Sequence, residues 1–115
     1  MKTISFTRNN DFLRLYRKGK VRSDPCLITY ILPNKLGFVR LGLTTSKKIG
    51  NAVARSRARR VMRVAIRELI PRLNGSYDIV LVARTRTTLI KSNALTSILT
   101  AQLEKLGALK SIEKE

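Results

Sequence analysis

The stretch from Ser46 to Arg72 constrains the fold most strongly, because a long helix would separate its charged residues from its apolar ones. It reads SKKIGNAVARSRARRVMRVAIRELIPR. At the ~100° per residue of an α-helix, its arginines and apolar residues fall on opposite arcs. The basic arc carries Arg55, at its edge, with Arg57, Arg59, Arg60, Arg63 and Arg67, and the apolar arc carries Ala54, Ala58, Val61, Met62, Ala65 and Leu69. The pattern predicts a helix with one side in a core and the other facing a polyanion.

Signals at both ends define the limits of this helix. Gly50 marks a turn, and Asn51 is suited to cap the first helical turn. Pro71 stops the regular helix, since proline cannot continue its hydrogen bonds. Val53 and Val64 interrupt the basic side, so the separation of charged from apolar residues is incomplete.

The chain as a whole is strongly basic. Its 115 residues include 24 Lys and Arg against 7 Asp and Glu, which gives a formal net charge of +17. On a small domain this surplus favours a large anionic partner, most simply nucleic acid, with an anionic membrane surface as the alternative. No apolar run approaches the ~20 residues of a membrane span and no signal-peptide pattern opens the chain, so we expect a cytoplasmic protein with no membrane partner. The hydrophobic fraction of 43% predicts a single RNA-binding domain over residues 1–115, with a frayed tail at 108–115.

Residues for catalytic and metal sites are scarce. The absence of histidine removes histidine-dependent triads and the usual zinc site. The seven acids form no close group of the kind found in metal-dependent nucleases, and a local explanation serves each, such as the strand-start position of Asp78. We therefore expect no catalytic residue and no bound cofactor, although an isolated carboxylate beside RNA phosphates could hold hydrated magnesium. Cys26 lies in an apolar run and is expected to be a small core residue.

The other segments predict an α-β-β-α-β-α order. A short helix at 9–17, capped by Asn9 or Asn10, precedes strands at 26–32 and 38–45, which we expect to pair as a hairpin. A strand that is apolar on both faces follows the basic helix at 77–83 and belongs in the middle of a covered sheet. The last helix, capped by Ser92 or Asn93, ends near Leu106, and Leu95, Ile98, Leu99, Leu103 and Leu106 form its buried stripe. This order predicts an α/β protein of the α+β two-layer sandwich type, with about four strands and a βαβ unit.

Two features between the first helix and the second strand bear on function. Phe12 and Tyr16 lie four residues apart and share a helix face, either as core residues or as a stacking platform for unpaired bases. Gly42 leaves a gap on the polar face of its strand, beside Arg40 and Thr44. The residues Lys18, Lys20 and Arg22 are expected to form a basic turn.

Four segments of the chain resemble segments of the bacterial ribonuclease P protein subunit, and they follow one another in the same order as in that family. The family signature K-K-x-G-x-A-V-x-R-N-R-x-K-R-x-x-R-E is matched by Lys47, Lys48, Gly50, Ala52, Val53, Arg55, Arg57, Arg60 and Arg63. A helix motif is matched by Asp11, Phe12, Tyr16 and Gly19, and two strand motifs are matched at 40–44 and 77–84. Three residues depart from the family pattern: Ser56 replaces an asparagine, Arg59 a lysine, and Val64 a glutamate.

The resemblance implies a fold with a left-handed βαβ crossover and two RNA-binding surfaces. A catalytic RNA subunit would bind this protein and remove the 5′ leader of precursor tRNA, in a reaction that requires Mg²⁺. The residues of this protein expected to contact the catalytic RNA are Lys47, Lys48, Asn51, Arg55, Ser56, Arg57, Arg59, Arg60, Arg63 and Arg67. The single-stranded leader is expected in a cleft lined by Phe12, Tyr16, Tyr30 and Arg40. Weak self-association without RNA remains open.

Two other functions fit the residues less well. A ribosomal or other structural RNA-binding protein would display the same charge without taking part in RNA processing. A nuclease acting without RNA is disfavoured because histidines are missing and the acids are scattered.

Overall fold

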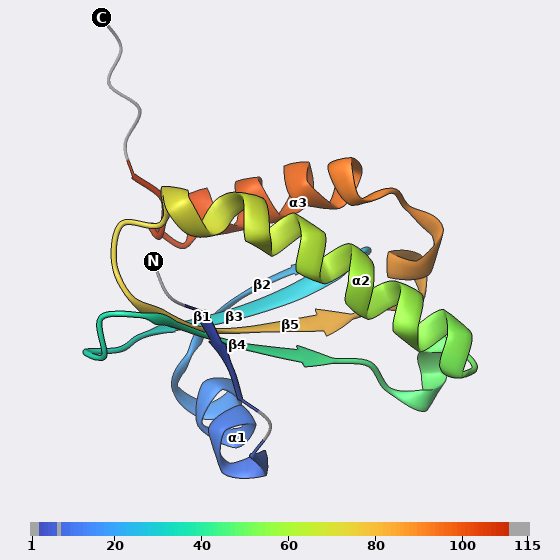
Figure 1. Cartoon of the computed structure of the whole chain (residues 1–115), viewed down its shortest axis with the longest axis horizontal. Helices are drawn as coiled ribbons and strands as arrows, with labels where there is room; N and C mark the ends of the chain where they lie inside the picture. The colour runs from blue at the N-terminus through green and yellow to red at the C-terminus, as the bar shows by residue number, and fades with distance from the viewer. Residues whose placement is uncertain (1–2, 7, 111–115) are drawn as a thin grey trace, which may run out of the picture.

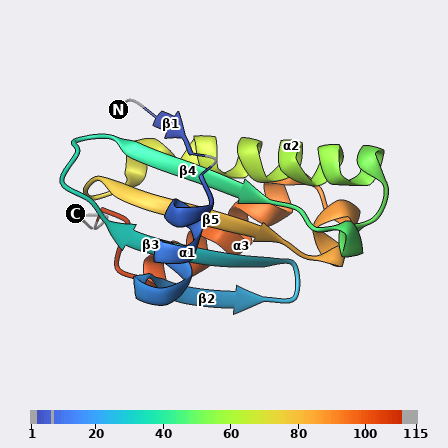
Figure 2. The same cartoon turned by 90° about the horizontal axis from the view of Figure 1, so that it is seen from below.

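The computed structural model describes residues 3–6 and 8–110, and it has the predicted α+β architecture (Figure 1). Helices α2 (Ala52–Leu69) and α3 (Ser92–Lys105) lie side by side on one face of a sheet, and α1 (Asn9–Lys18) lies on the opposite face (Figures 1 and 2). The predicted sandwich is thus formed by the sheet with α2 and α3, and α1 adds a partial cover to the other side.

The sheet contains five strands in the order β1-β4-β5-β3-β2. At its centre, β5 (Tyr77–Ala83) runs parallel to β4 (Val39–Thr44) and antiparallel to β3 (Leu27–Pro33). The central place of β5 explains why both of its faces are apolar. The hairpin predicted for the strands at 26–32 and 38–45 is wrong, because these strands are β3 and β4 and β5 lies between them.

The two edge strands, β1 and β2, were not predicted. About four strands were expected, whereas the sheet has five. β2 (Lys20–Asp24) pairs antiparallel with β3, so the expected basic turn at Lys20 and Arg22 is a strand. Its side chains are mostly exposed and charged or polar, which hides the alternation of a half-buried strand. β1 (Thr3–Ser5) pairs parallel with β4 and is too short for a periodic signal.

The crossover from β4 through α2 to β5 is left-handed. In Figure 1 both strands point to the right, β5 lies behind β4, and α2 returns above them; Figure 2 shows the same order from below. Most crossovers between parallel strands are right-handed. The handedness expected from the resemblance is therefore confirmed.

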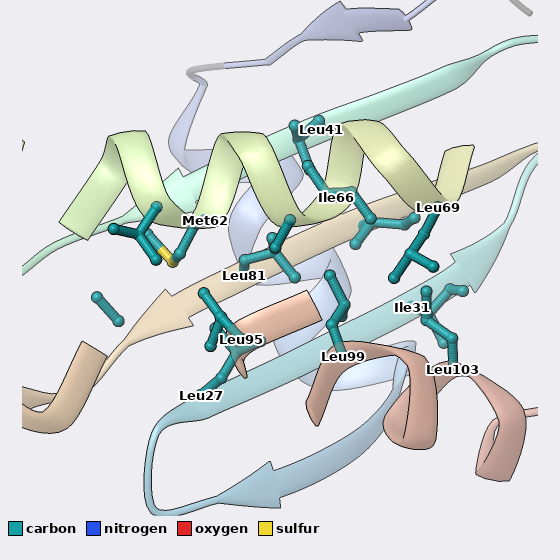
Figure 3. Packing of buried hydrophobic residues seen from close by; sticks show 14 of the residues in the cluster. Leu27, Ile31, Leu41, Met62, Ile66, Leu69, Leu81, Leu95, Leu99 and Leu103 are labelled. Atoms are coloured by element: carbon teal, nitrogen blue, oxygen red, sulfur yellow. The ribbon is translucent and has the colours of Figure 1, made fainter. Parts of the chain in front are cut away.

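The main core lies between the sheet and helices α2 and α3 (Figure 3). The helix α2 buries Ala58, Val61, Met62, Ala65, Ile66 and Leu69, which confirms most of the predicted apolar arc and adds Ile66. From α3, Leu95, Leu99 and Leu103 are fully buried, whereas Ile98 and Leu106 are half-buried. A second, smaller cluster around Phe6, Leu15 and Val80 holds α1 against the opposite face.

The ends of the helices follow the sequence signals only in part. The Asn51 side chain accepts a hydrogen bond from the Ala54 amide at 2.9 Å, which confirms the predicted cap of α2. The caps predicted for α1 and α3 are wrong: Arg8 and Lys91 occupy those N-cap positions without a side-chain hydrogen bond, one residue before Asn9 and Ser92.

The frayed tail expected from residue 108 is wrong for its first three residues. Ala108 is buried, and the Lys110 amide donates a hydrogen bond to the Arg72 carbonyl at 2.8 Å. The rest of the predicted tail, 111–115, lies outside the described residues. Among the helices of 3–6 and 8–110, none combines the length and hydropathy of a membrane span.

Candidate nucleic-acid interface

The basic side of α2 forms an open face of the molecule. Arg57, Arg60, Arg63 and Arg67 are exposed, and Arg55 and Arg59 are half-buried. Lys47 and Lys48 extend this face through the short 3-10 helix η1 (Lys47–Ile49), whose Ile49 is buried and fixes the turn to the core. At the following turn Gly50 adopts φ +137°, a conformation that L side chains rarely adopt. All ten residues expected to contact the catalytic RNA therefore lie on η1, on the turn that follows it, or on α2.

Hydrogen bonds to neutral oxygens orient three of the arginines. Arg55 donates to the Gly50 carbonyl at 2.8 Å, and Arg57 donates through Nε to the Thr88 carbonyl at 3.0 Å. Arg59 donates to Thr45 Oγ1 at 2.7 Å and to Ser56 Oγ at 3.3 Å. A guanidinium has five N–H donors, so each of these groups keeps donors for a phosphate while its position is partly fixed.

No arginine or lysine of this face forms an ion pair within the described part of the chain. The ion pairs found there all involve Asp11 or Asp78, on the opposite side of the sheet. The positive charge of α2 therefore remains available to a polyanion, and like-charge repulsion along the helix would be relieved by binding one.

A second candidate surface lies where α1 crosses the sheet. The Tyr16 and Tyr30 rings meet edge to face with centroids 4.9 Å apart, and Tyr16 is 40% exposed. The Phe12 ring packs on Phe6 with centroids 5.0 Å apart and is half-buried. Burial raises the pKa of the Tyr16 hydroxyl, an effect partly offset by the Thr44 side chain. The structure thus brings together the three aromatic residues expected in the leader cleft, with Tyr16 the more exposed of the two on α1.

Gly42 provides the space for these rings. A Cβ atom at this position would lie 2.7 Å from Phe12 Cε1 and 2.8 Å from Phe6 Cε2. The gap expected from the sequence is therefore filled by two rings of the protein itself.

A buried ionic network ties α1 to the sheet beneath these rings. The Asp78 carboxylate is fully buried and forms ion pairs with Arg14 of α1 and with Arg40 of β4, the latter at 2.6 Å. Asn34 donates to the same carboxylate at 2.8 Å, and Arg40 also lies 3.5 Å from Asp11. The strand-start explanation of Asp78 was incomplete, because its partners are distant in sequence.

The network shifts the pKa values of its members. Burial alone would raise the pKa of Asp78, but hydrogen bonds from Arg40 and Asn34 and the charges of Arg40 and Arg14 outweigh it and lower that pKa. The hydrogen bond to Asp78 raises the pKa of Arg40. Arg40, expected in the leader cleft, is thus already engaged by a carboxylate, and its side chain is only 21% exposed.

Arg14 and the role of Asp78 in this network were not predicted from the sequence. The available signal was an acid inside an otherwise apolar strand, which demands a partner when buried. It did not reveal which of the 24 basic residues supplies that partner. Within the described ranges, no group of three His, Cys, Asp or Glu residues is arranged to hold a metal ion.

Comparison with known proteins identifies relatives of this chain. The sequence model of a family described as Ribonuclease P matches residues 1–107. A ribonuclease P protein component from Alkaliphilus oremlandii (strain OhILAs) is 36% identical over 112 residues, covering 96% of this chain and 98% of that protein. Another, from Alkaliphilus metalliredigens (strain QYMF), is 43% identical over 77 residues, covering 67% and 69%.

Solved structures show the same fold. The RNase P protein of Staphylococcus aureus superposes with a TM-score of 0.82 at 27% identity, covering 95% of this chain and 100% of that one. A mutant of the S. aureus protein, described as defective in mRNA degradation activity, gives 0.80 at 27% identity, covering 91% and 89%. The RNase P protein from Thermotoga maritima, 23% identical, gives 0.73 and covers 96% and 98%, and it supports the fold alone.

Proposed function

This chain belongs to the ribonuclease P protein family, and we propose that it is the protein subunit that helps a catalytic RNA remove the 5′ leader of precursor tRNA. In this proposal the RNA performs the hydrolysis and the protein brings two polyanions together. The reaction's magnesium requirement is implied by the family, and no step is assigned to a metal held by this chain. We place the activity in the bacterial cytoplasm.

The basic face of α2 supports a role in binding the catalytic RNA. Its arginines present forked donors that match phosphate oxygens, and several are held in place by protein oxygens. The contacts proposed for the catalytic RNA are Lys47, Lys48, Asn51, Arg55, Ser56, Arg57, Arg59, Arg60, Arg63 and Arg67. Neutralising RNA phosphates releases counterions, so this binding should weaken steeply with salt. Asn51 and Ser56 are proposed to position other groups for the RNA. Asn51 caps α2, and the Ser56 hydroxyl accepts a hydrogen bond from Arg59.

The α1 face supports a role in binding the single-stranded leader. An exposed ring such as Tyr16 offers a stacking surface to any base, which suits a leader of variable sequence. Tyr30 supports that ring from β3, and Phe12 extends the aromatic surface along α1. Arg40 is proposed to hold α1 and its rings in place through Asp78 and Asp11, in addition to adding positive charge.

The single observation that carries the proposal is the separation of these two surfaces. The basic face lies on the α2 side of the sheet and the aromatic face on the α1 side (Figures 1 and 2). One small protein can therefore contact two RNA molecules at once, which a purely structural RNA-binding role does not require.

A reconstitution experiment tests the proposal. Precursor tRNA is incubated with the protein alone, with the ribonuclease P RNA of the same organism alone, and with both, at a magnesium concentration where the RNA alone is slow. We expect 5′ leader removal to be fast only with both. Cleavage by the protein alone would indicate a protein nuclease, and an unchanged rate with both would indicate a structural protein. A messenger RNA substrate in the protein-only reaction tests whether the activity named for the S. aureus protein is shared.

A further inference from the structure

The basic face of α2 continues onto a second element that the sequence did not associate with RNA. The 3-10 helix η3 (Thr85–Leu89) packs against α2 and η1, and it leads directly into α3 (Figure 1). Arg57 joins the two elements by donating to the Thr88 carbonyl at 3.0 Å. Arg86 and Lys91 are exposed on or beside η3 and add two charges to the face.

Among the described residues, the elements that form the combined surface carry one acid near it, Glu68 at the C-terminal end of α2. The sequence has no Asp or Glu from 25 to 67, and none from 79 to 103. These two segments supply η1, η3, the start of α3 and most of α2. The part of the surface assembled from these two acid-free segments is complementary to a polyanion.

Two apolar side chains stand out on this basic surface. Val53 is 77% exposed and Leu89 is 76% exposed, whereas the next most exposed large hydrophobic residue in the described part of the chain, Leu36, is 50% exposed. Val53 precedes Arg57 by one helical turn, and Leu89 follows the residue whose carbonyl accepts from Arg57. Val53 lines a hollow together with Arg57, and Leu89 is next in sequence to the residue that Arg57 binds, so both lie on elements joined by the Arg57 hydrogen bond.

The surface is also shaped. Arg57 and Arg60 line two open hollows. The first is also lined by Ala52, Val53 and Ser56, and the second by Val61, Val64, Lys91, Ser92 and Asn93. A regular RNA duplex presents phosphates and ribose hydroxyls to a protein, and its base faces are hidden by stacking. Exposed apolar side chains gain little from such a surface, but they gain from the face of a base that is not stacked.

We propose that Val53 and Leu89 contact an unstacked nucleotide of the catalytic RNA while Arg57 and Arg60 hold the adjoining phosphates. This inference rests on the proposed function and extends its RNA interface from α2 across η3 to the start of α3. The composite surface recognises a place where the RNA helix is interrupted, and the arginines alone would bind any RNA backbone.

Salt dependence separates the two kinds of contact. The logarithm of the binding constant falls linearly as the logarithm of the salt concentration rises. Replacing a residue that contacts phosphate makes this slope less negative by about 0.7–0.9, because one fewer counterion is released. Replacing an apolar residue lowers affinity without changing that slope. The turn between β3 and β4 offers matched controls, since Lys35 and Leu36 are exposed there, away from α2 (Figure 1).

The experiment measures binding of labelled ribonuclease P RNA and of an uninterrupted RNA duplex at several salt concentrations. The variants are Leu89→Ala, Val53→Ala, Arg60→Ala, Leu36→Ala and Lys35→Ala. We expect Leu89→Ala and Val53→Ala each to weaken binding of the catalytic RNA roughly threefold to tenfold, the scale of one buried apolar contact. Their salt slopes and their affinity for the duplex should equal those of the wild type, as should their unfolding transitions, because both side chains are exposed.

The contrary results are distinct. Wild-type affinity of Leu89→Ala and Val53→Ala for the catalytic RNA, or an equal loss on the duplex, would overturn the inference. A loss of the same size with Leu36→Ala would overturn it too, by showing a nonspecific effect. Failure of the proposed function looks different: the wild-type protein itself would bind the catalytic RNA no better than the duplex, and the inference would fall with it.

Discussion

Replacing Asp78 by asparagine tests whether the buried network holds α1 in place. The substitution preserves volume but leaves Arg14 and Arg40 without their carboxylate. Breaking a buried ion pair costs ~3–5 kcal/mol. The side chains of Arg14 and Arg40 are 42% and 21% exposed, so water can replace part of the lost interaction. We therefore expect a loss of about 2–3 kcal/mol in the free energy of unfolding at pH 7.

The pKa of Asp78 also predicts how this loss of stability changes with pH. The pKa of Asp78 is lower in the folded protein than the ~3.9 of an unfolded aspartate. Its contribution to stability is therefore fully present above about pH 5 and disappears as the pH falls through the folded-state value. The difference in unfolding free energy between the wild type and Asp78→Asn should be constant from pH 7 to 5 and shrink at lower pH.

Urea unfolding of the wild type and the variant between pH 3.5 and 7 provides the assay. Glu68→Gln is the matched control, because Glu68 is exposed and forms no ion pair within the described residues; it should change stability by less than ~0.5 kcal/mol. A difference for Asp78→Asn below ~0.5 kcal/mol at pH 7, or one that stays the same at pH 3.5, would refute the reasoning.

Three further predictions concern the two RNA surfaces. Tyr16→Ala should weaken binding of precursor tRNA to the holoenzyme about tenfold, the scale of one stacked base, without affecting mature tRNA; equal losses for both would show that the ring does not contact the leader. Gly42→Ala should destabilise the fold by ~1–3 kcal/mol and reduce leader selectivity, because its Cβ would lie 2.7 Å from Phe12, and calorimetry with leader-binding measurements checks this. Arg63→Ala combined with Arg67→Ala should lower the salt slope for catalytic-RNA binding by about 1.5 with unchanged stability, whereas an unchanged slope would remove both residues from the interface.

The elements with a strong periodic signal could be predicted from sequence. The arginine and apolar arcs of α2 and the cap at Asn51 appear in the structure as expected, and so does β5. These features depend on neighbours in sequence, since a helix repeats every 3.6 residues and a cap bonds three residues ahead. The short β1 and the polar edge strand β2 lack such a signal, because their strand character depends on the partner they pair with.

Contacts between distant segments account for what could not be predicted. The position of β5 between β3 and β4 is a property of the whole sheet, and a short connection between two strands favoured the wrong hairpin. Asp78 meets Arg14 and Arg40 only once α1 crosses the sheet. Leu89 and Lys91 join the basic face because η3 folds back against α2, and their sequence neighbours carry no mark of it.

The charged side of α2 is expected to form one ordered RNA-binding site, and every role proposed above for the catalytic RNA depends on it. Directed strand scission tests it: an iron-chelate reagent is attached to a cysteine at Ser56→Cys or at Lys35→Cys, each in a Cys26→Ser background, and the protein is assembled with the catalytic RNA. Ser56 is exposed beside Arg57 and Arg60, and Lys35 is exposed on the distant turn. We predict cleavage confined to one region of the RNA from position 56 and none above background from position 35. Cleavage that is dispersed, or equal from both positions, would contradict the account.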